Sequence, residues 1–554
     1  MLRTRLIAAA LLLNIFFPLA SCGGGGGSSS PPPGIAFGLE ARPAAVAYLN
    51  MPLTEAGTIP ALLSQTGVFF DEGGSIPNMI PGSSLIPYSM NSPLWSDGAS
   101  KSRWISVPTG QKVVFTTTGE WTFPVGTVFV KHFEMATDEG DPGVIRRLET
   151  RLLVAKADGT YYGVTYKWKS DNSDADLLAV DLTETIAIEQ VGSGSWTKSY
   201  TYPVTSCNTC HNSNANFILG VMTPQMNGMF NYPSTGVTDN QLRTWSHIGM
   251  FDVTLDESVI PTYDKLVPVT ATGAGLEERV RSYLHANCAL CHRAGGSVPT
   301  TWDVRSHMFT ETSLTGATLA NNFLGLDNPE EVGEKDLGRS YMFLRIARTS
   351  AEGFQMPSVG RNHVDFDAVG TFQEWIDSLA GTPVLIPPAI SPDGGTHNPA
   401  TVTVSIQHPN PVAAIYYTTD GSDPDATDNF YTTSFSLDVT GGIEIRAAAL
   451  GTGFVTSAVA SKTFDFNPGI GTMASTPIFS TNGGTFTGSV VISIVSGTSG
   501  STIRYTLNGA TPDSSSREYD GPITISRFTH LKAVAIKAGL ADSPVASAIF
   551  LVNP

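Results

Sequence analysis

The stretch Ile415-Tyr-Tyr-Thr-Thr-Asp-Gly-Ser-Asp-Pro-Asp425 recurs later in the chain as Ile503-Arg-Tyr-Thr-Leu-Asn-Gly-Ala-Thr-Pro-Asp513. Two further pairs flank it: Gly394-Gly-Thr396 matches Gly483-Gly-Thr485, and Val459-Ala-Ser461 matches Val545-Ala-Ser547. Each copy alternates apolar and polar residues in short runs separated by turn formers, which is typical of antiparallel strands. The sequence therefore predicts two β-sandwich repeats, at 388–466 and 476–554.

These repeats resemble the small sandwich at the C-terminus of chitobiases and other surface proteins, which is similar to a fibronectin type III fold. The resemblance implies a spacing or docking role, with polysaccharide contact as a weaker option, and a fold alone does not decide between them. The Asp-rich turn at 420–425 is compatible with a calcium site, but turn geometry explains its composition better.

The cysteines carry the clearest chemistry. The 554-residue chain has five: Cys22, Cys207, Cys210, Cys288 and Cys291. Four of them form Cys207-Asn-Thr-Cys210-His211 and Cys288-Ala-Leu-Cys291-His292. In a C-x-x-C-H motif the two thiols attach a c-type haem covalently and the histidine ligates its iron. Disulfides or a zinc site with four ligands from both motifs are the alternatives. Because the two motifs use every cysteine except Cys22, we predict two haem c groups with His211 and His292 as axial ligands.

Helices are predicted on both sides of the second motif. Apolar residues at 276, 280 and 283/284 share one helical face before Cys288, and Asp365 can cap a second helix that runs to Leu379. The pair resembles the terminal helices of cytochrome c. In that family a Met before Pro commonly supplies the distal thioether ligand, which implies this role for Met356, with His363 as the competing ligand.

The first motif differs, because residues 196–203 before it are predicted to be extended chain rather than helix. Its distal ligand stays open. The candidates between the motifs are Met222, Met226, Met229, His247 and Met250. A vacant sixth position is also compatible with the sequence and would allow small-molecule chemistry.

Residues 45–200 are predicted to be rich in β-strands. Strand-like runs occur at 113–115 and 127–130, and 148–168 is predicted to be a hairpin around Asp158-Gly159. Lys101 and Arg103 are compatible with binding haem propionates, although solvated surface charges are the interpretation we favour.

The N-terminus is predicted to be an export signal. Residues 1–21 have a short basic region followed by an apolar run that is too short to span a membrane. Leu19-Ala-Ser-Cys22 looks like a bacterial lipobox, with lipidation of Cys22; an ordinary secretory signal is the alternative. Residues 22–44 form a Gly/Ser/Pro tether. By resemblance to bacterial lipoproteins, the absence of Asp after Cys22 favours sorting to the outer membrane over retention in the inner membrane.

Composition excludes some classes of function. Lys+Arg 32 against Asp+Glu 49 gives a net charge of −17, which is unfavourable for binding nucleic acid through phosphates. The acidic balance favours basic redox partners.

Together these features predict a multidomain α+β protein. Its expected parts are a β-rich domain at 45–200, a mainly α-helical, cytochrome c-like dihaem region at 201–271 and 272–382, and the two sandwiches. The segments 92–99, 123–128, 207–211 and 283–293 resemble a family of bacterial exported dihaem c-type proteins, over about 85–380. The resemblance implies haem binding and electron transfer but no defined substrate.

The function expected first is an electron-transfer lipoprotein between redox proteins at the cell envelope, on its periplasmic or outer face. The alternatives are a dihaem oxidoreductase or peroxidase-like enzyme with an open haem 1, and a surface polymer-binding or adhesion protein with a redox module.

Overall fold

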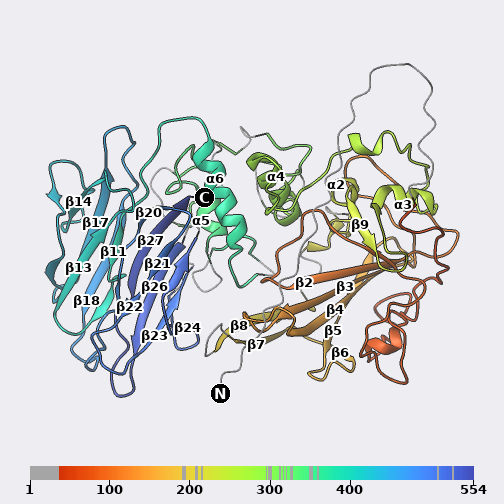
Figure 1. Ribbon diagram of the computed structural model, residues 1–554, viewed down its shortest axis with the longest axis horizontal. Helices are drawn as coiled ribbons and strands as arrows, with labels where there is room; N and C mark the ends of the chain where they lie inside the picture. The colour runs from red at the N-terminus through yellow and green to blue at the C-terminus, as the bar shows by residue number, and fades with distance from the viewer. Residues whose placement is uncertain are drawn as a thin grey trace, which may run out of the picture. The chain divides into compact units, whose positions relative to one another are not determined.

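The computed structural model describes residues 36–189, 195–205, 210–213, 216–294, 296, 298, 302–310, 314–315, 317, 319, 321–324, 329–348, 354–358, 361–507, 509, 511–526 and 529–553. The expected signal peptide, the lipidation site Cys22, most of the tether and Cys207 lie outside these residues. Strands supply most of the regular structure (Figure 1).

A six-stranded antiparallel sheet forms the first β-region, with the strands in chain order from one edge to the other. The strands are β1 (Ile86–Tyr88), β2 (Ser100–Ser106), β3 (Val128–Ala136), β4 (Ile145–Ala155), β5 (Tyr161–Trp168) and β6 (Ala175–Leu177), and a 3₁₀ turn, η1 (Leu63–Thr66), precedes them. The predicted hairpin is confirmed: β4 pairs with β5 across a turn in which Gly159 has φ 80°. Val113 and Val114 form only isolated bridges, so the strand predicted at 113–115 is wrong.

The two faces of this sheet bury different clusters. One face carries Val130, Leu152 and Val164 in a core that the segment before β1 completes. The other face contributes Ile105, Phe129 and Leu153 to a core that includes residues from 218–260. A separate hairpin, β7 (Leu182–Glu189) and β8 (Ser195–Tyr202), confirms that the chain before the first motif is extended.

The mainly α-helical, cytochrome c-like dihaem region is wrong, and with it the α+β classification. In the described part of 201–382 there are five α-helices of four to thirteen residues, and most of the remaining chain is loop. The helices are α2 (Thr223–Met226), α3 (Gln241–His247), α4 (Leu276–Asn287), α5 (Tyr341–Ile346) and α6 (Phe366–Ser378); they occur with η3 (Ile260–Thr262) and the hairpin β9 (Met229–Tyr232) and β10 (Val237–Asn240). The two helices that flank the second motif do form, but a helical character does not extend to the rest of the region.

Helices α4 and α6 pack against each other as their apolar faces predict. The Asp365 side chain accepts a hydrogen bond from the backbone N–H of Ala368 (3.2 Å) and so caps α6. Tyr283 and Phe372 meet edge to face, with ring centroids 5.8 Å apart. Both rings belong to a buried cluster that continues into α5 and includes the partly buried Cys288 and Met356.

The C-terminal strands form two copies of one arrangement. In the first copy the five-stranded sheet has the order β12-β18-β17-β14-β15, and in the second β20-β27-β26-β23-β24, so equivalent strands occupy equivalent places. The strands of the first copy are β11 (Ala389–Ser391), β12 (Gly395–His397), β13 (Thr401–Gln407), β14 (Ala414–Thr418), β15 (Asn429–Phe430), β16 (Phe435–Asp438), β17 (Ile443–Leu450) and β18 (Ala460–Phe466). Those of the second are β19 (Ile478–Phe479), β20 (Gly484–Thr487), β21 (Val490–Ile492), β22 (Ile494–Val495), β23 (Thr502–Thr506), β24 (Arg517–Glu518), β25 (Ile523–Ile525), β26 (Thr529–Ile536) and β27 (Ala546–Asn553). Each copy has its own buried core.

The Asp-rich turn of the first repeat uses its carboxylates locally. Asp420 Oδ1 accepts hydrogen bonds from the backbone and the hydroxyl of Ser422, and Asp425 does the same for Thr427. Turn geometry therefore accounts for these residues. Among the helices that the structure describes, none is long and apolar enough to cross a membrane.

Candidate functional site

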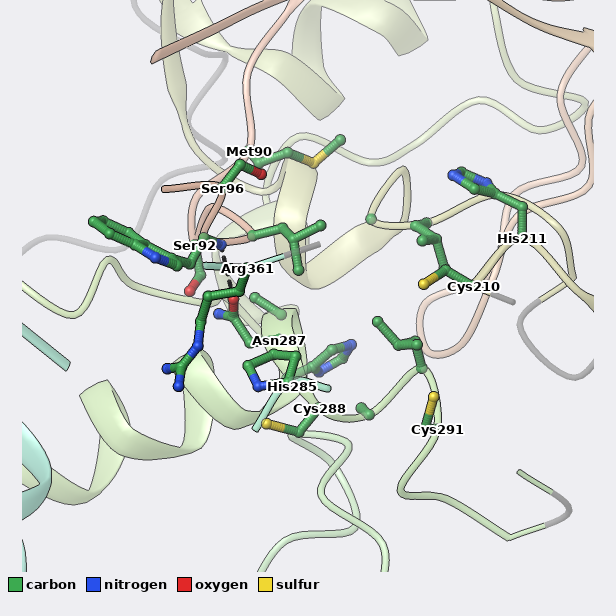
Figure 2. Close-up of a pocket in the computed structure, with 18 of the residues that line it drawn as sticks. Met90, Ser92, Ser96, Cys210, His211, His285, Asn287, Cys288, Cys291 and Arg361 are labelled. Atoms are coloured by element: carbon green, nitrogen blue, oxygen red, sulfur yellow. Dashed lines mark hydrogen bonds between the residues drawn. The ribbon is translucent and has the colours of Figure 1, made fainter. Parts of the chain in front are cut away.

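A cavity of about 520 Å³ brings the two C-x-x-C-H motifs together. Cys210 and His211 of the first motif line it, and so do Cys288, Cys291 and His292 of the second. Figure 2 shows the side chains of both motifs around this space. The volume falls within the range of roughly 300–1,000 Å³ that is common for small-molecule and cofactor sites.

The first motif is held by backbone contacts in irregular chain. His211 Nδ1 lies 2.7 Å from the carbonyl oxygen of Phe217. Burial lowers the pKa of His211 to about 4, so the ring is neutral and Nδ1–H donates to that carbonyl. The lone pair then lies on Nε2, which is how a histidine is oriented when it ligates a metal through Nε2. Phe217 is fixed in turn by the neighbouring ring of Tyr161, 5.5 Å away.

The second motif begins where α4 ends. The backbone N–H of Cys288 donates to Leu284 O (2.8 Å) and that of His292 donates to Cys288 O (2.9 Å), so the motif continues the helix as turns. The His292 ring stacks on Trp302, with centroids 4.3 Å apart and planes 5° from parallel. Its Nδ1 is buried and has no hydrogen-bond partner among the residues that the structure describes, and burial lowers the pKa of the ring to about 4.

The two cysteine sulfurs of the second motif are free. Cys288 and Cys291 form no disulfide, so the disulfide alternative is wrong for this motif. Burial raises the pKa of Cys288 to about 12, which keeps it a protonated thiol. Cys207, the fourth expected attachment point, lies outside the described residues.

Met356 lines the cavity and packs in the same cluster as Cys288 and Trp302. Its backbone N–H donates to Arg345 O (3.0 Å). His363, the competing ligand, is not among the described residues that line the cavity, and its backbone bonds to Trp95 and Asp97. The geometry therefore favours Met356 of the two, and its ligation stays a prediction.

The structure describes all five candidates for the distal ligand of the first haem, and they differ in their position relative to the cavity. Met222 lines the cavity. Met226 and Met250 are buried in the core, Met229 is 63% exposed, and His247 stacks on Phe37 at 3.5 Å. Sequence reasoning missed Met90, which also lines the cavity and is seen beside it in Figure 2. The sequence singles out only the neighbouring segment 92–99, and a single methionine before it has no pattern that would mark it as a ligand.

The segment 92–98 connects the sheet to the second motif. The backbone N–H of Trp95 donates to Asn287 Oδ1 at the end of α4 (2.8 Å), and its indole N–H donates to His363 O (3.0 Å). The buried Asp97 carboxylate accepts from the backbone N–H groups of Asn362 and His363 (2.8 and 2.7 Å). These contacts hold α4 and the chain before α6 against one side of the cavity.

His285 is a second residue that the sequence did not single out. Its Nδ1 accepts from the backbone N–H of Ser306 (3.0 Å), so the ring proton lies on Nε2. The Ser306 hydroxyl donates to Asp264 Oδ2 (2.6 Å). A neutral imidazole that carries a proton on Nε2 therefore lines the cavity.

Lys101 and Arg103 are not solvated surface charges, and that interpretation is wrong. Lys101 Nζ donates to Leu94 O (2.7 Å) and to Ala99 O (3.3 Å), and burial lowers its pKa to about 7. Arg103 lines the cavity together with Lys131 and Arg151. The cavity wall formed by the sheet therefore carries three basic side chains.

The expectation of a metal-binding cytochrome is corrected. Within the described ranges, no group of three or more His, Cys, Asp or Glu side chains is placed to hold a metal ion, and the fold is β-rich rather than that of a cytochrome c. Haem attachment through thioether bonds and one histidine requires no such group, and it stays a prediction.

The comparisons with known proteins concern the C-terminal repeats. Residues 392–461 and 481–547 each match the family of chitobiase/β-hexosaminidase C-terminal domains, which confirms that part of the resemblance. No comparison supports the resemblance to dihaem proteins. Among curated proteins, none matches the chain significantly.

Several solved structures are similar to parts of the chain. They include the fibronectin(III)-like modules of Clostridium thermocellum CbhA (13% identity, TM-score 0.13, covering 30% of this chain and 94% of that one). The BSP domain of a biofilm associated protein has 17% identity and a TM-score of 0.17, with 31% and 30% covered. A 1.5-MDa bacterial ice-binding adhesin has 12% identity and a TM-score of 0.12, with 31% and 66% covered. Likenesses at these TM-scores support no statement about function.

Proposed function

We propose that this chain is an exported cell-envelope protein that combines a redox module carrying two covalently attached haem c groups with a C-terminal domain pair that binds a surface polymer. The observation that supports the redox module best is the cavity itself, because residues of both C-x-x-C-H motifs line it. Haem supplies reversible one-electron chemistry, while the protein supplies ligands, burial and electrostatics. We propose electron transfer between redox proteins as the role of this module.

The residues present fit this cofactor. Three of the four attachment cysteines line the cavity, and Cys288 and Cys291 are free, partly buried thiols. His211 is held with Nε2 available, and Met356 offers a thioether on the side of the second motif. His292 Nδ1 is buried and has no hydrogen-bond partner in the described part of the chain, a condition that costs roughly 1–3 kcal/mol when nothing compensates it.

The test is whether the full-length protein carries covalently attached haem when it is produced in a host that matures c-type cytochromes. Intact mass and the absorbance of the denatured protein are expected to show two haems per chain. Cys210→Ala and Cys291→Ala are each expected to remove one. A chain that carries no covalent haem would refute the redox module.

The spin state of the first haem separates a carrier from an enzyme. A six-coordinate, low-spin first haem is expected for electron transfer, with Met90 or Met222 as the sixth ligand. A five-coordinate first haem that turns over peroxide would replace the carrier with the oxidoreductase alternative. Optical and EPR spectra of the purified protein decide between them.

The polymer-binding role is supported by an aromatic pair on the first sandwich. Tyr416 of β14 and Phe430 of β15 are cross-strand partners with centroids 5.4 Å apart, and Phe430 is 56% exposed. The equivalent positions of the second repeat hold Arg504 and Glu518, whose side chains form an ion pair at 3.1 Å. Exposed aromatic faces on a soluble domain mark contact surfaces, and rings of this kind can stack on sugar rings.

Retention of the full-length protein on insoluble chitin and cellulose tests this role. The double variant Tyr416→Ala, Phe430→Ala is expected to elute at least tenfold more readily. The double variant Arg504→Ala, Glu518→Ala is the matched control and should be retained like the wild type. Equal elution of all three proteins would leave the domains as spacers.

Attachment to the envelope through Cys22 is part of the proposal and rests on the sequence alone. In a bacterial host, Cys22→Ala should release the protein from the membrane fraction. Membrane retention of that variant would indicate another mode of attachment.

A further inference from the structure

We infer that Arg103, Lys131 and Arg151, one from each of three neighbouring strands, form a site for the carboxylate groups of a ligand held in the cavity. We call these three side chains the cation row. The inference deepens the proposed function and rests on it where the ligand is the haem of the first motif.

The strand register aligns the three cations. Arg103 on β2 lies directly opposite Lys131 on β3, and Lys131 lies directly opposite Arg151 on β4. All three line the cavity. Like charges that face each other across strands repel, and burial, with the charges of Arg103 and Arg151, holds the pKa of Lys131 well below its ordinary value. The row is therefore fully charged only when an anion lies beside it.

The protein itself neutralises only one end of the row. Arg151 donates to Glu149 Oε1 (2.5 Å). Lys131 lies over the Phe133 ring, 5.0 Å from its centroid, and Arg103 makes one long hydrogen bond, to Lys101 O (3.5 Å). Within the described residues, neither Arg103 nor Lys131 has a carboxylate oxygen at ion-pair distance.

The position of the row argues against an incidental charge cluster. On the same sheet face, Ile105, Phe129 and Leu153 are apolar on one side of it, and Phe133 continues an apolar cluster on the other. Cations in such a setting are expensive unless they are paired. Arginine and lysine at hydrogen-bond reach of one ligand are the usual partners of carboxylates.

The row lies near the first motif. Burial is the main cause of the lowered pKa of His211, and the charges of Lys131 and Arg151 lower it further. For His292 the added charge is that of Arg345 instead. The carboxylates therefore belong either to the propionates of the first haem or to a free carboxylate ligand beside it.

The first arm of the test compares Lys131→Gln with Lys112→Gln, which removes one charge from an exposed lysine. The reduction potentials of the full-length haem protein are titrated from about pH 5 to pH 8, which spans the range where a carboxyl with a raised pKa ionises. In wild type and Lys112→Gln, the cation row keeps the propionates ionised and the potential stays nearly constant. In Lys131→Gln one potential is expected to fall at high pH and to rise again as the pH drops, because the propionate pKa is higher.

The second arm uses succinate as the probe and calorimetry as the readout. If the propionates occupy the row, succinate should bind only to a Cys207→Ala, Cys210→Ala chain, and adding Lys131→Gln should weaken that binding at least tenfold. If a free carboxylate is the ligand, succinate should bind the haem protein itself, again more weakly with Lys131→Gln.

Two results would overturn the inference: potentials of Lys131→Gln that match those of Lys112→Gln, together with no succinate binding to either chain. If the purified chain carries no haem, the proposed function fails, but the succinate arm still tests the row. Binding that Lys131→Gln weakens would then support the row, and binding that this substitution leaves unchanged would refute it.

Discussion

The two C-x-x-C-H motifs have the same spacing but are held in different ways. The first follows a β-hairpin and is fixed by a histidine–carbonyl hydrogen bond in irregular chain. The second motif directly follows the twelve-residue helix α4, which packs against α6. The comparison shows that this motif specifies local chemistry without specifying the fold that presents it.

The two motifs are also anchored to different hydrophobic cores. The chain after the first motif is anchored to the aromatic cluster around Trp121, whose indole N–H donates to Thr223 Oγ1 (3.1 Å). The second motif depends on the cluster around Phe372. Because the cores share no residues, we expect damage to one motif to leave the other intact.

The largest expected effect comes from breaking these cores one at a time. Phe372→Ala should lower the free energy of unfolding of its region by about 3–5 kcal/mol, because a fully buried ring is lost. Both haems should stay on the chain, because their thioether bonds survive unfolding, but the optical spectrum of the second haem should show loss of its distal ligand while that of the first haem stays unchanged.

Trp121→Ala is the matched variant for the first motif, since this ring is also fully buried. It should perturb the spectrum of the first haem and leave that of the second unchanged. If either substitution perturbed both haems, the two motifs would depend on a common core and the comparison would fail.

Met356→Ala tests the next difference, the distal side of the second motif. Loss of a thioether ligand lowers the reduction potential of a haem, so one of the two potentials should fall and the thioether charge-transfer band should lose the contribution of the second haem. Met229→Ala, which removes an exposed methionine, is the control and should leave that band in place. An unchanged band in Met356→Ala would reject this ligand.

The helix caps provide a smaller and symmetrical test. Asp365 caps α6 beside the second motif, and Asn240 caps α3, in the segment after the first, by accepting from Leu242 N (2.9 Å). Replacing either residue by Ala should cost about 1 kcal/mol. Urea unfolding should show Asp365→Ala weakening only the transition in which the second haem, still covalently attached, loses its distal ligand, and equal shifts in both transitions would contradict the comparison.

The sequence predicted the parts of this molecule that local patterns determine. The repeat at 415–425 and 503–513 identified the sandwiches, and the spacing of apolar residues identified α4 and α6, because periodicity reports which face is buried. The error was to extend the helical character of 276–287 to the whole of 201–382. That region is mostly loop, whose tertiary contacts leave no period in the sequence.

The cation row shows a second limit. Arg103, Lys131 and Arg151 become neighbours only through the strand register, which a single sequence does not display. A weak signal was present, because Lys131 directly follows the apolar run 128–130 and Arg151 directly precedes the apolar run 152–154. A charge within a buried strand marks a place where a partner is needed.

The smallest expected effect concerns the His292 ring, which stacks on Trp302. Trp302→Leu removes the stacking on His292, an interaction worth about 0.5–1.5 kcal/mol beyond its buried area. The first motif has no such stack on its histidine among the described residues, since His211 is oriented by Phe217 O instead. The substitution should therefore broaden the EPR signal of the second haem and leave that of the first unchanged. Tyr161→Leu is the counterpart, because the Tyr161 ring supports Phe217; it should perturb the first haem alone. If Trp302→Leu left both signals sharp, the turn after α4 would be enough to orient His292, and the two motifs would differ only in the chain that leads into them.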